Sequence, residues 1–328
     1  MTSFRTELRP ERNATEIDHK RPVFFIGSCF SDNMGRKFAD HRFHVVHNPF
    51  GVTYNPVSIS EQLKRLAEQR PFEEEDLIQC NGGWNSFELH GSFQSASEKE
   101  LLDKANKSLK DSSRRLAPAS HLFLTMGTAW VYRHKEKDII VNNCHKISAR
   151  EFSREKLEVE DMVSALEKAI AEVRKINPSI HVVYTVSPVR HLKDGFEENS
   201  LSKAALRLAA ARLAGMEKSS YFPSYELVMD DLRDYRFYKK DMLHPSDEAI
   251  DYIWDKLSSS MFSEECKKVL PKIEKLSRSL AHRPQNAGSS SHREFLEGCL
   301  SLARSIRDNE GITELDADIE KLRKILGN

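Results

Sequence analysis

Two short segments of the chain carry residues that can do nucleophilic chemistry. Asp241 and His244 lie three residues apart in Asp-Met-Leu-His-Pro, where the proline prevents the backbone from continuing as a helix. Much earlier, Ser28 and Cys29 follow a glycine and the apolar run Val23–Ile26. A thiol or hydroxyl, an imidazole and a carboxylate are the groups of a nucleophile, a base and an orienting acid. The sequence therefore predicts a covalent catalytic site that is built from both segments.

The place of Ser28 and Cys29 along the chain also favours a nucleophile. Catalytic side chains in open α/β sheets project from the carboxyl ends of strands, and these two residues follow such a strand. The positive end of the helix that comes next favours a thiolate or an oxyanion. Cys29 or Ser28 would attack, His244 would be general base and acid, and Asp241 would orient the imidazole. We expect one of the two nucleophilic atoms to lie about 3–4 Å from His244.

The elements that must position these residues alternate along the chain, which is typical of parallel βα units. Strands are predicted at 23–27, 43–47, 121–126, 180–186 and 219–222, with a hairpin of 129–133 and 138–142. Helices are predicted at 31–41 after a Ser31 cap, from capping boxes at Ser58 and Ser97, at 159–176 and 201–213, and at 247–257 after a Ser246 cap. Residues 187–200 are predicted to form a long loop. This order indicates one α/β core.

The pattern changes after Phe262 to charged helices. A stretch rich in Gly and Ser at 284–291 has the composition of a linker. We therefore predict a catalytic domain over residues 1–262 and a C-terminal helical extension over residues 263–328.

Composition excludes several classes of function. The 328 residues include 50 Lys and Arg against 50 Asp and Glu, so no basic excess indicates a nucleic-acid or anionic-membrane partner. No apolar run approaches the ~20 residues that span a bilayer. Residues 1–20 are polar and carry acids, unlike an export signal, and the five cysteines are irregularly spaced. We therefore expect a cytoplasmic protein with free thiols.

Six short segments follow one another in a characteristic order. They are Phe25–Ser31, Asn48–Gly51 with Tyr54–Pro56, Met126–Tyr132, Asn143–Lys146, Ser187–His191 and Asp241–Pro245. Together they resemble the GSCFA-domain family of the SGNH (GDSL-like) hydrolase superfamily, with a departure at Ser31, where the family motif ends in alanine. The resemblance implies a flavodoxin-like three-layer α/β/α sandwich with a mostly parallel central sheet. It also implies hydrolysis or transfer of an acyl ester.

The resemblance implies roles for single residues. Against the Gly-Asp-Ser block of the superfamily, Gly27 matches the glycine, Ser28 falls on the aspartate and Cys29 falls on the nucleophilic serine. Asp241 and His244 match the final Asp-x-x-His block in full. A thiol needs less activation than a hydroxyl, which favours Cys29, whereas a shifted turn would make Ser28 the nucleophile. A thioester intermediate is more readily transferred than an oxygen ester, so Cys29 also favours acyl transfer.

The oxyanion hole is the least complete part of the resemblance. The superfamily supplies a glycine N–H, for which Gly51 is the candidate, and an asparagine in Gly-x-Asn-Asp. Gly127-Thr128-Ala-Trp stands at that second place, so the Thr128 hydroxyl or Asn55 would have to donate instead. The loss of one oxyanion donor typically lowers the rate ~10²–10³-fold. The alternative to an enzyme is therefore a binding protein that kept the cleft and lost turnover.

Two other segments of the resemblance are candidates for lining the pocket. Arg190 and His191 follow a predicted strand, and Arg190 is either a ligand for a carboxylate or phosphate of the substrate or a solvated loop charge. Cys144 and His145 are adjacent, so in a strand their side chains would point to opposite faces. His145 is accordingly either pocket lining or structural.

The sequence gives no sign of a cofactor. His41, His44 and His47 cross a predicted helix–strand boundary and would not share a face, so no metal site is predicted. The expected partner is a small-molecule or carbohydrate-linked acyl ester, and the oligomeric state is left open.

Overall fold

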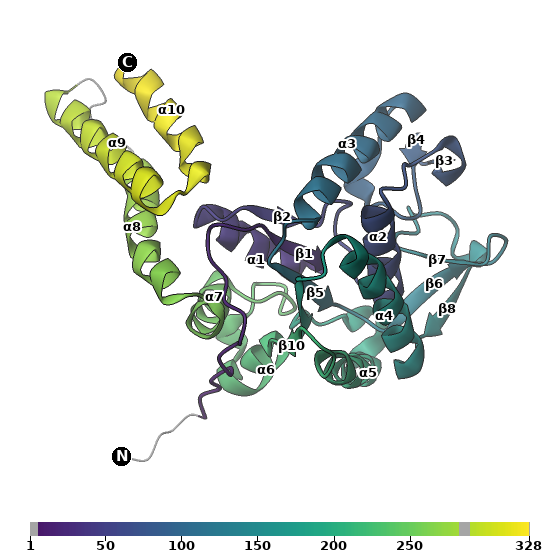
Figure 1. Cartoon of the computed structure of the whole chain (residues 1–328). Helices are drawn as coiled ribbons and strands as arrows, with labels where there is room; N and C mark the ends of the chain where they lie inside the picture. The colour runs from purple at the N-terminus through teal and green to yellow at the C-terminus, as the bar shows by residue number, and fades with distance from the viewer. Residues whose placement is uncertain (1–5, 282–288, 328) are drawn as a thin grey trace.

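A five-stranded parallel sheet forms the centre of the computed structural model, which describes residues 6–281 and 289–327 without the Asp194 side chain (Figure 1). Its strands are β1 (Val23–Gly27), β2 (Val45–His47), β5 (His121–Met126), β9 (His181–Val186) and β10 (Ser219–Tyr221). Their spatial order is β10-β9-β5-β1-β2. In chain order this is 2-1-3-4-5, the flavodoxin-like arrangement, whose winding reverses between β1 and β5. The predicted α/β class with a parallel sheet is confirmed.

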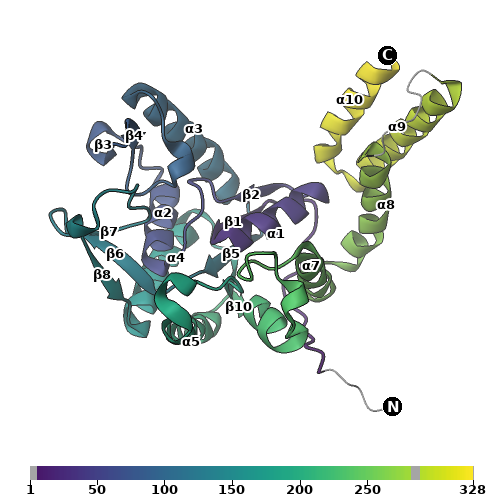
Figure 2. The same ribbon diagram turned by 180° about the vertical axis from the view of Figure 1, so that it is seen from behind.

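Helices cover both faces of this sheet (Figures 1 and 2). They are α1 (Cys29–Asp40), α2 (Pro56–Glu68), α3 (Glu98–Leu116), α4 (Val159–Ile176), α5 (Gly195–Ala214), α6 (Ser224–Glu226) and α7 (Asp247–Met261). Successive strand residues point to opposite faces, so Phe24 and Ile26 pack with α2–α5 while Val23 and Phe25 pack with α1 and α7. The result is the three-layer sandwich that the resemblance implied.

A smaller antiparallel sheet follows directly on β5. It consists of β6 (Trp130–His134), β7 (Ile139–Val141) and β8 (Phe152–Lys156), in the order β7-β6-β8. The β6–β7 pair is the predicted hairpin, whereas β8 and the short pair β3 (Ile78–Cys80) and β4 (Gly83–Asn85) were not predicted. Because β6 begins just after the carboxyl end of β5, this sheet borders the edge where catalytic side chains are expected.

Helices α1, α2 and α5 begin earlier than predicted. Asn55 caps α2, since its Oδ1 accepts a hydrogen bond from the Ser58 amide at 2.8 Å. The proline that follows Asn55 suits the first helical position because its φ is already close to the helical value. Helix α5 begins at Gly195, so the long loop predicted at 187–200 is shorter.

The C-terminal part of the chain is helical, as predicted (Figures 1 and 2). It contains α8 (Glu264–Ala281), α9 (Ser290–Glu310) and α10 (Asp316–Leu326), which share an apolar cluster of their own. The Arg42 Nε donates to Asp318 Oδ2 at 2.7 Å and ties α10 to the turn after α1. Of the predicted linker, residues 284–288 lie outside the described residues, and the α9 helix already begins at Ser290.

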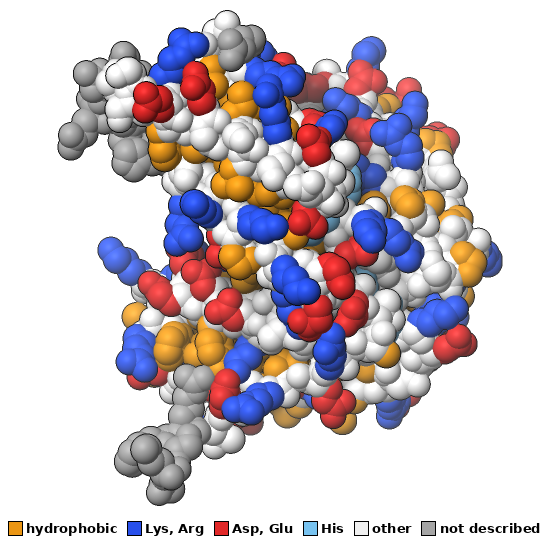
Figure 3. All heavy atoms as spheres, turned by 60° about the vertical axis from the view of Figure 1, so that its left-hand side comes forward, with side chains coloured by type: hydrophobic (Ala, Val, Ile, Leu, Met, Phe, Trp, Pro, Cys, Tyr) orange, Lys and Arg blue, Asp and Glu red, His pale blue; other side chains and the backbone are white. Residues whose placement is uncertain are grey.

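Charged side chains of both signs are mixed on the surface. Figure 3 shows Lys and Arg beside Asp and Glu over the face turned to the viewer, without a large area of one sign. Among the described residues, no helix is long and apolar enough to cross a membrane.

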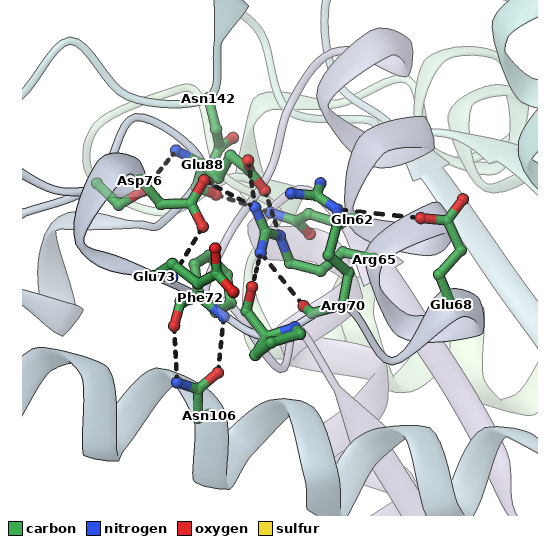
Figure 4. A network of polar contacts seen from close by, with 12 residues as sticks. Gln62, Arg65, Glu68, Arg70, Phe72, Glu73, Asp76, Glu88, Asn106 and Asn142 are labelled. Atoms are coloured by element: carbon green, nitrogen blue, oxygen red, sulfur yellow. Dashed lines mark hydrogen bonds and ion pairs between the residues drawn. The ribbon is translucent and has the colours of Figure 1, made fainter.

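A buried arginine ties α2 to the loop that follows it (Figure 4). Arg65 is inaccessible to solvent, and its Nε and Nη2 donate to the two carboxylate oxygens of Glu88 at 2.8 and 2.7 Å. Its Nη1 donates to the carbonyl of Pro71 at 2.7 Å, and its guanidinium lies 4.0 Å from the centre of the Phe72 ring. The Glu88 carbonyl in turn accepts from Asn142 Nδ2 at 3.4 Å, so the network reaches the segment after β7.

Replacing Arg65 by methionine should lower the free energy of unfolding by about 3 kcal/mol, because a paired carboxylate and backbone carbonyls lose their donor. Lys99→Met is the control, since Lys99 pairs with Asp103 only on the exposed surface of α3. Urea denaturation followed by tryptophan fluorescence should show a lower midpoint for the first variant only. Equal midpoints would mean that the Arg65 network adds no stability.

Candidate active site

A tight turn between β1 and α1 carries the candidate nucleophiles. Gly27 has φ +147°, and a Cβ on it would lie 2.2 Å from the Thr125 carbonyl oxygen, so only glycine fits. Ser28 is buried, and its Oγ accepts a hydrogen bond from the Phe30 amide at 3.2 Å, which makes it the N-cap. The helix therefore begins at Cys29, and the prediction that it would begin after a cap at Ser31 is wrong. The Ser28 hydroxyl is engaged in capping, whereas Cys29 is half-buried on the first turn.

The surroundings of Cys29 keep its sulfur protonated near neutral pH. Burial raises the pKa of the thiol above its ordinary value, and the negative charge of Asp32 raises it further. The Lys203 ammonium and the amides of Cys29 and Phe30 act in the opposite direction, but do not outweigh burial. Cys29 therefore needs a base to remove its proton before it can attack.

Asp241 and His244 meet within one loop before α7. Asp241 Oδ2 lies 2.7 Å from His244 Nδ1, and Asp241 Oδ1 accepts from the amides of Leu243 and His244 at 2.9 and 3.0 Å. These amides, followed by the imidazole, lower the pKa of Asp241 to about 2. A carboxylate at Nδ1 favours the tautomer with its proton on that nitrogen. Nε2 is then left as a proton acceptor.

One cavity brings residues from distant parts of the chain together. Its volume is about 460 Å³, and its lining includes Cys29 after β1, Thr128 after β5, Arg190 and His191 after β9, and His244. This is the carboxyl edge of the sheet, where a doubly wound fold places ligands. Within the described residues, no hydrogen bond joins the Cys29 sulfur to His244, although both line this cavity. The structure thus places Cys29 and His244 around one cavity, without the hydrogen-bond contact that was predicted.

The comparisons with known proteins bear on this arrangement. The sequence model of the GSCFA family matches residues 22–257. The chain belongs to the GSCFA family. A second model, the C-terminal domain of GSCFA domain proteins, matches residues 273–327. No curated protein sequence matches this GSCFA chain.

Solved structures that resemble the GSCFA chain are distant. A carbohydrate esterase family 3 from Talaromyces cellulolyticus has 7% identity and a TM-score of 0.35, with 78% of this chain and 99% of that chain covered. The acetyl xylan esterase Est2A from Butyrivibrio proteoclasticus has 11% identity and a TM-score of 0.36, with 74% and 65% covered.

Most of the expected oxyanion donors already have acceptors in this GSCFA structure. The Gly51 amide donates to Asn48 O at 2.8 Å, and Gly51 does not line the cavity with Cys29 among the described residues. The amides of Gly127 and Thr128 both donate to the Tyr54 carbonyl, at 2.7 and 3.1 Å. These contacts hold the two strand ends in place, so the amides of all three residues are unsuited to bind an oxyanion.

The two side chains proposed to replace the missing asparagine are also engaged. Asn55 lines the cavity, but its Oδ1 caps α2 and its Nδ2 donates to Ser58 Oγ at 2.9 Å. The Thr128 hydroxyl lies 3.3 Å from Ser202 Oγ and accepts from the Trp130 amide at 3.1 Å. The sequence motifs do not indicate that Asn55 caps a helix or that Thr128 anchors a loop, so both residues were predicted as oxyanion donors.

His145 and His191 have different surroundings. His145 is buried, and its Nε2 lies 2.7 Å from the Ser86 carbonyl, which fits the structural alternative. His191 lines the cavity, and burial, followed by Lys203 and His244, lowers its pKa to about 4. A neutral imidazole beside His244 adds no positive charge at neutral pH.

Tyr54 belongs to the Tyr54–Pro56 segment of the family resemblance but was not predicted as a site residue. Its ring makes an edge contact with His191, with centroids 5.5 Å apart, and it lines the cavity with Cys29. Burial, followed by Cys29 and Asp32, raises the pKa of the phenol. Tyr54 is therefore a neutral hydroxyl donor in the cavity.

Lys203 on α5 was missed altogether. It is buried, and its Nζ donates to the carbonyls of Gly127 and Ser187 at 2.7 Å each, which close the ends of β5 and β9. Burial lowers its pKa to about 7, while Cys29 acts in the opposite direction. Its spacing to the buried Leu206 places it on the inward stripe of α5, which was the available signal.

The lowered pKa of Lys203 has a consequence for stability. Between about pH 7 and its ordinary pKa of 10.5, Lys203 is protonated in the unfolded chain but not in the folded chain. The contribution of Lys203 to the free energy of unfolding therefore increases as pH rises through this range. In a Cys29→Ala background, where the nearby thiol cannot titrate, Lys203→Met should lose this rise. Denaturation midpoints from pH 7 to pH 9.5 would test it, and parallel curves for the two proteins would contradict it.

Three side chains of the cavity lining carry buried polar atoms that have no hydrogen-bond partner among the described residues. They are Trp130 Nε1, Asn142 Oδ1 and His191 Nε2. Such an atom typically costs about 1–3 kcal/mol when nothing satisfies it. Their gathering around one cavity is typical of a functional site in which bound molecules complete the hydrogen bonds.

Proposed function

We propose that this GSCFA protein is an acyl-ester hydrolase or acyltransferase of the SGNH type, with Cys29 as nucleophile. The observation that supports the proposal is that Cys29 lines one cavity with His244, whose imidazole is oriented by Asp241. We also propose that residues 1–262 carry this chemistry and that residues 263–328 form a separate extension.

The proposed reaction begins at the Cys29 thiol. His244 Nε2 takes the thiol proton while the sulfur attacks the ester carbonyl, and Asp241 stabilises the imidazolium that forms. The C–O bond then breaks, and His244 returns the proton to the leaving alcohol. Water or an acceptor hydroxyl next attacks the thioester, with His244 again as base, and the sulfur leaves as a thiol. A protonated resting thiol fits a mechanism that depends on His244.

Two donors are suited to the oxyanion of the tetrahedral intermediate. The Cys29 amide lies on the first turn of α1, at the positive end of the helix. Tyr54 supplies a neutral hydroxyl in the same cavity. We propose that this pair replaces the glycine amide and the asparagine of the superfamily pattern.

The proposal is tested by labelling the purified protein with iodoacetamide and with a fluorophosphonate, followed by peptide mass spectrometry. In the wild type, Cys29 should label faster than the other cysteines, and the excess should vanish in His244→Ala. Cys266 is the internal control, because it is buried away from the cavity. Equal, slow labelling of Cys29 in both proteins would overturn the proposal.

The second candidate function is a binding protein of the same fold with little or no turnover. It is favoured by the engaged donors at Gly51, Gly127 and Asn55, and by the lack of a hydrogen bond between Cys29 and His244 in the described structure. Loss of activation with retained ligand binding in the cavity would support it.

A further inference from the structure

The cavity that contains Cys29 adjoins a second one. Tyr54, Tyr132, Asn142 and Lys193 line both, and the second cavity also has a volume of about 460 Å³. We call the second cavity the distal chamber and define it by the residues that only it adds, including His90, Asn143, Cys144, Lys146 and Phe152. Because four side chains are shared, the two cavities are neighbours. We call the two together the cleft, and each has the size of a small-molecule site.

The Lys, Arg, Asp and Glu residues in the described lining of this cleft are all basic. Arg154, Arg190 and Lys193 line the part with Cys29, and Lys146 and Lys193 line the distal chamber. None of the described lining residues is Asp or Glu, although the whole chain has as many acidic as basic residues. A cleft lined by one sign of charge concentrates ligands of the opposite sign.

Arg190 is held by neutral groups in its described contacts. Its guanidinium carbon lies 5.1 Å from the ring centre of Tyr238, and its Nη2 lies 3.8 Å from the sulfur of Met229. These contacts orient the guanidinium without neutralising it. Its charge therefore adds to the positive potential of the cleft.

Lys193 stands where the two parts of the cleft join. Its Nζ donates to the Tyr132 hydroxyl at 2.9 Å. Its charge also reaches into the distal chamber, since it lowers the pKa of Cys144 against the larger raising effect of burial. A ligand that passes Tyr132 into the distal chamber would therefore meet this ammonium group.

The segment that presents Lys146 is held in an unusual backbone conformation. His145 and Lys146 have φ of +48° and +58°, a region that non-glycine residues seldom adopt. His145 is anchored through its ring to Ser86, and its amide donates to Asn143 Oδ1 at 2.9 Å. Strain of this kind persists where the surroundings enforce it, often at ligand sites. Lys146 and Cys144, on this segment, both line the distal chamber.

The remaining lining suits a hydroxyl-rich ring. Tyr54, Trp130 and Tyr132 supply aromatic surface. The donor Trp130 Nε1 and the acceptor Asn142 Oδ1, in the same lining, have no hydrogen-bond partner within the described structure. We propose that the cleft binds an O-acylated sugar that carries an oxyanion group, either carboxylate or phosphate. The acyl carbonyl would lie at Cys29 and the anionic group at Lys193 and Lys146. The placement of the acyl carbonyl at Cys29 rests on the proposed function, whereas the placement of the anionic group at Lys193 and Lys146 does not.

Three matched esters would test it: O-acetylated methyl glucoside, O-acetylated methyl glucosiduronic acid and O-acetylated glucose 1-phosphate. We expect kcat/KM to be roughly 10- to 100-fold higher for at least one anionic ester, as for a charge-assisted hydrogen bond. Comparison of the glucosiduronic acid ester with the glucose 1-phosphate ester shows whether the cleft prefers a carboxylate or a phosphate. The preference should shrink as salt is added, because the lysines are exposed and their charges are screened.

Lys146→Gln and Lys193→Gln should each lower the preference for the anionic ester about 10-fold. Lys137→Gln is the matched control, because Lys137 is exposed on the β6–β7 turn and does not line the cleft. It should leave the preference unchanged. A preference that survives in both cleft variants, or equal turnover of neutral and anionic esters, would overturn the inference.

A binding measurement separates this inference from the proposed function. Methyl glucosiduronic acid, glucose 1-phosphate and methyl glucoside would be titrated into the wild type and the two lysine variants by calorimetry. Tighter binding of an anionic sugar that is lost in the variants supports the inference even where no ester is turned over. In that case only the ester chemistry would fail. Equal binding of the three sugars would overturn the inference, whatever the turnover.

Discussion

Replacement of Cys29 by alanine is expected to lower kcat/KM for an activated acyl ester by at least about 10³-fold, whereas Ser28→Ala retains most of the activity. The two residues are neighbours in the sequence, but the Ser28 hydroxyl stabilises a helix end whereas Cys29 lines the cavity. Ser28 Oγ is buried and caps α1 through the Phe30 amide, so its loss should destabilise the helix by about 1 kcal/mol. Cys29 lines the cavity and carries the attacking atom in the proposed mechanism.

Both variants would be assayed with 4-nitrophenyl acetate, and their thermal midpoints would be compared by circular dichroism. Ser28→Ala should show the lower midpoint and Cys29→Ala the lower activity. The opposite pattern, with activity lost in Ser28→Ala and kept in Cys29→Ala, would make the serine the nucleophile. That outcome would require the turn after β1 to rearrange when substrate binds.

Replacement of His244 by alanine is expected to lower kcat by about 10³–10⁴-fold, because His244 lines the cavity with Cys29, is oriented by Asp241, and takes the thiol proton in the proposed mechanism. His191 lines the same cavity, but its ring is oriented by no carboxylate in the described structure. Asp241→Asn should have a smaller effect than His244→Ala. The asparagine keeps the hydrogen bonds from the loop amides, and Asp241 is exposed, so solvent weakens its charge.

Imidazole in the buffer provides a readout that a merely structural role would not show. It should restore part of the activity of His244→Ala and none of that of Cys29→Ala, since only the first lacks a base. Asp241, whose pKa is lowered to about 2, stays ionised at the pH of the assay, so the rescue reports on the missing imidazole and not on Asp241. Imidazole rescue of both variants, or of neither, would contradict the assignment of His244 as general base.

Features that depend on near neighbours along the chain could be read from its residues. The apolar runs predicted the five parallel strands, although β2 is shorter than expected. The Ser97 and Ser246 caps lie where they were predicted. The Asp241–His244 pair also depends on local order, because the two residues are three positions apart in one loop. A short loop before a helix leaves their side chains few other arrangements.

Two helix starts show the limit of such local rules. Serines stand at 28, 31 and 58, and each suits an N-cap, but the caps of α1 and α2 are Ser28 and Asn55. The choice follows from where β1 must end against Thr125 and where the Tyr54 carbonyl meets the end of β5. Those constraints come from strands that are far apart in the sequence.

The cavity itself came from contacts between distant parts of the chain. Cys29 and His244 line one cavity because β1 lies beside β5 and the loop before α7 returns to the same edge of the sheet. Lys203 lies under this edge because α5 packs across β9, and no motif marked it. Spacing specifies which side chains share a strand or a helix face. The neighbours across the sheet depend on long-range pairing, which sequence spacing does not encode.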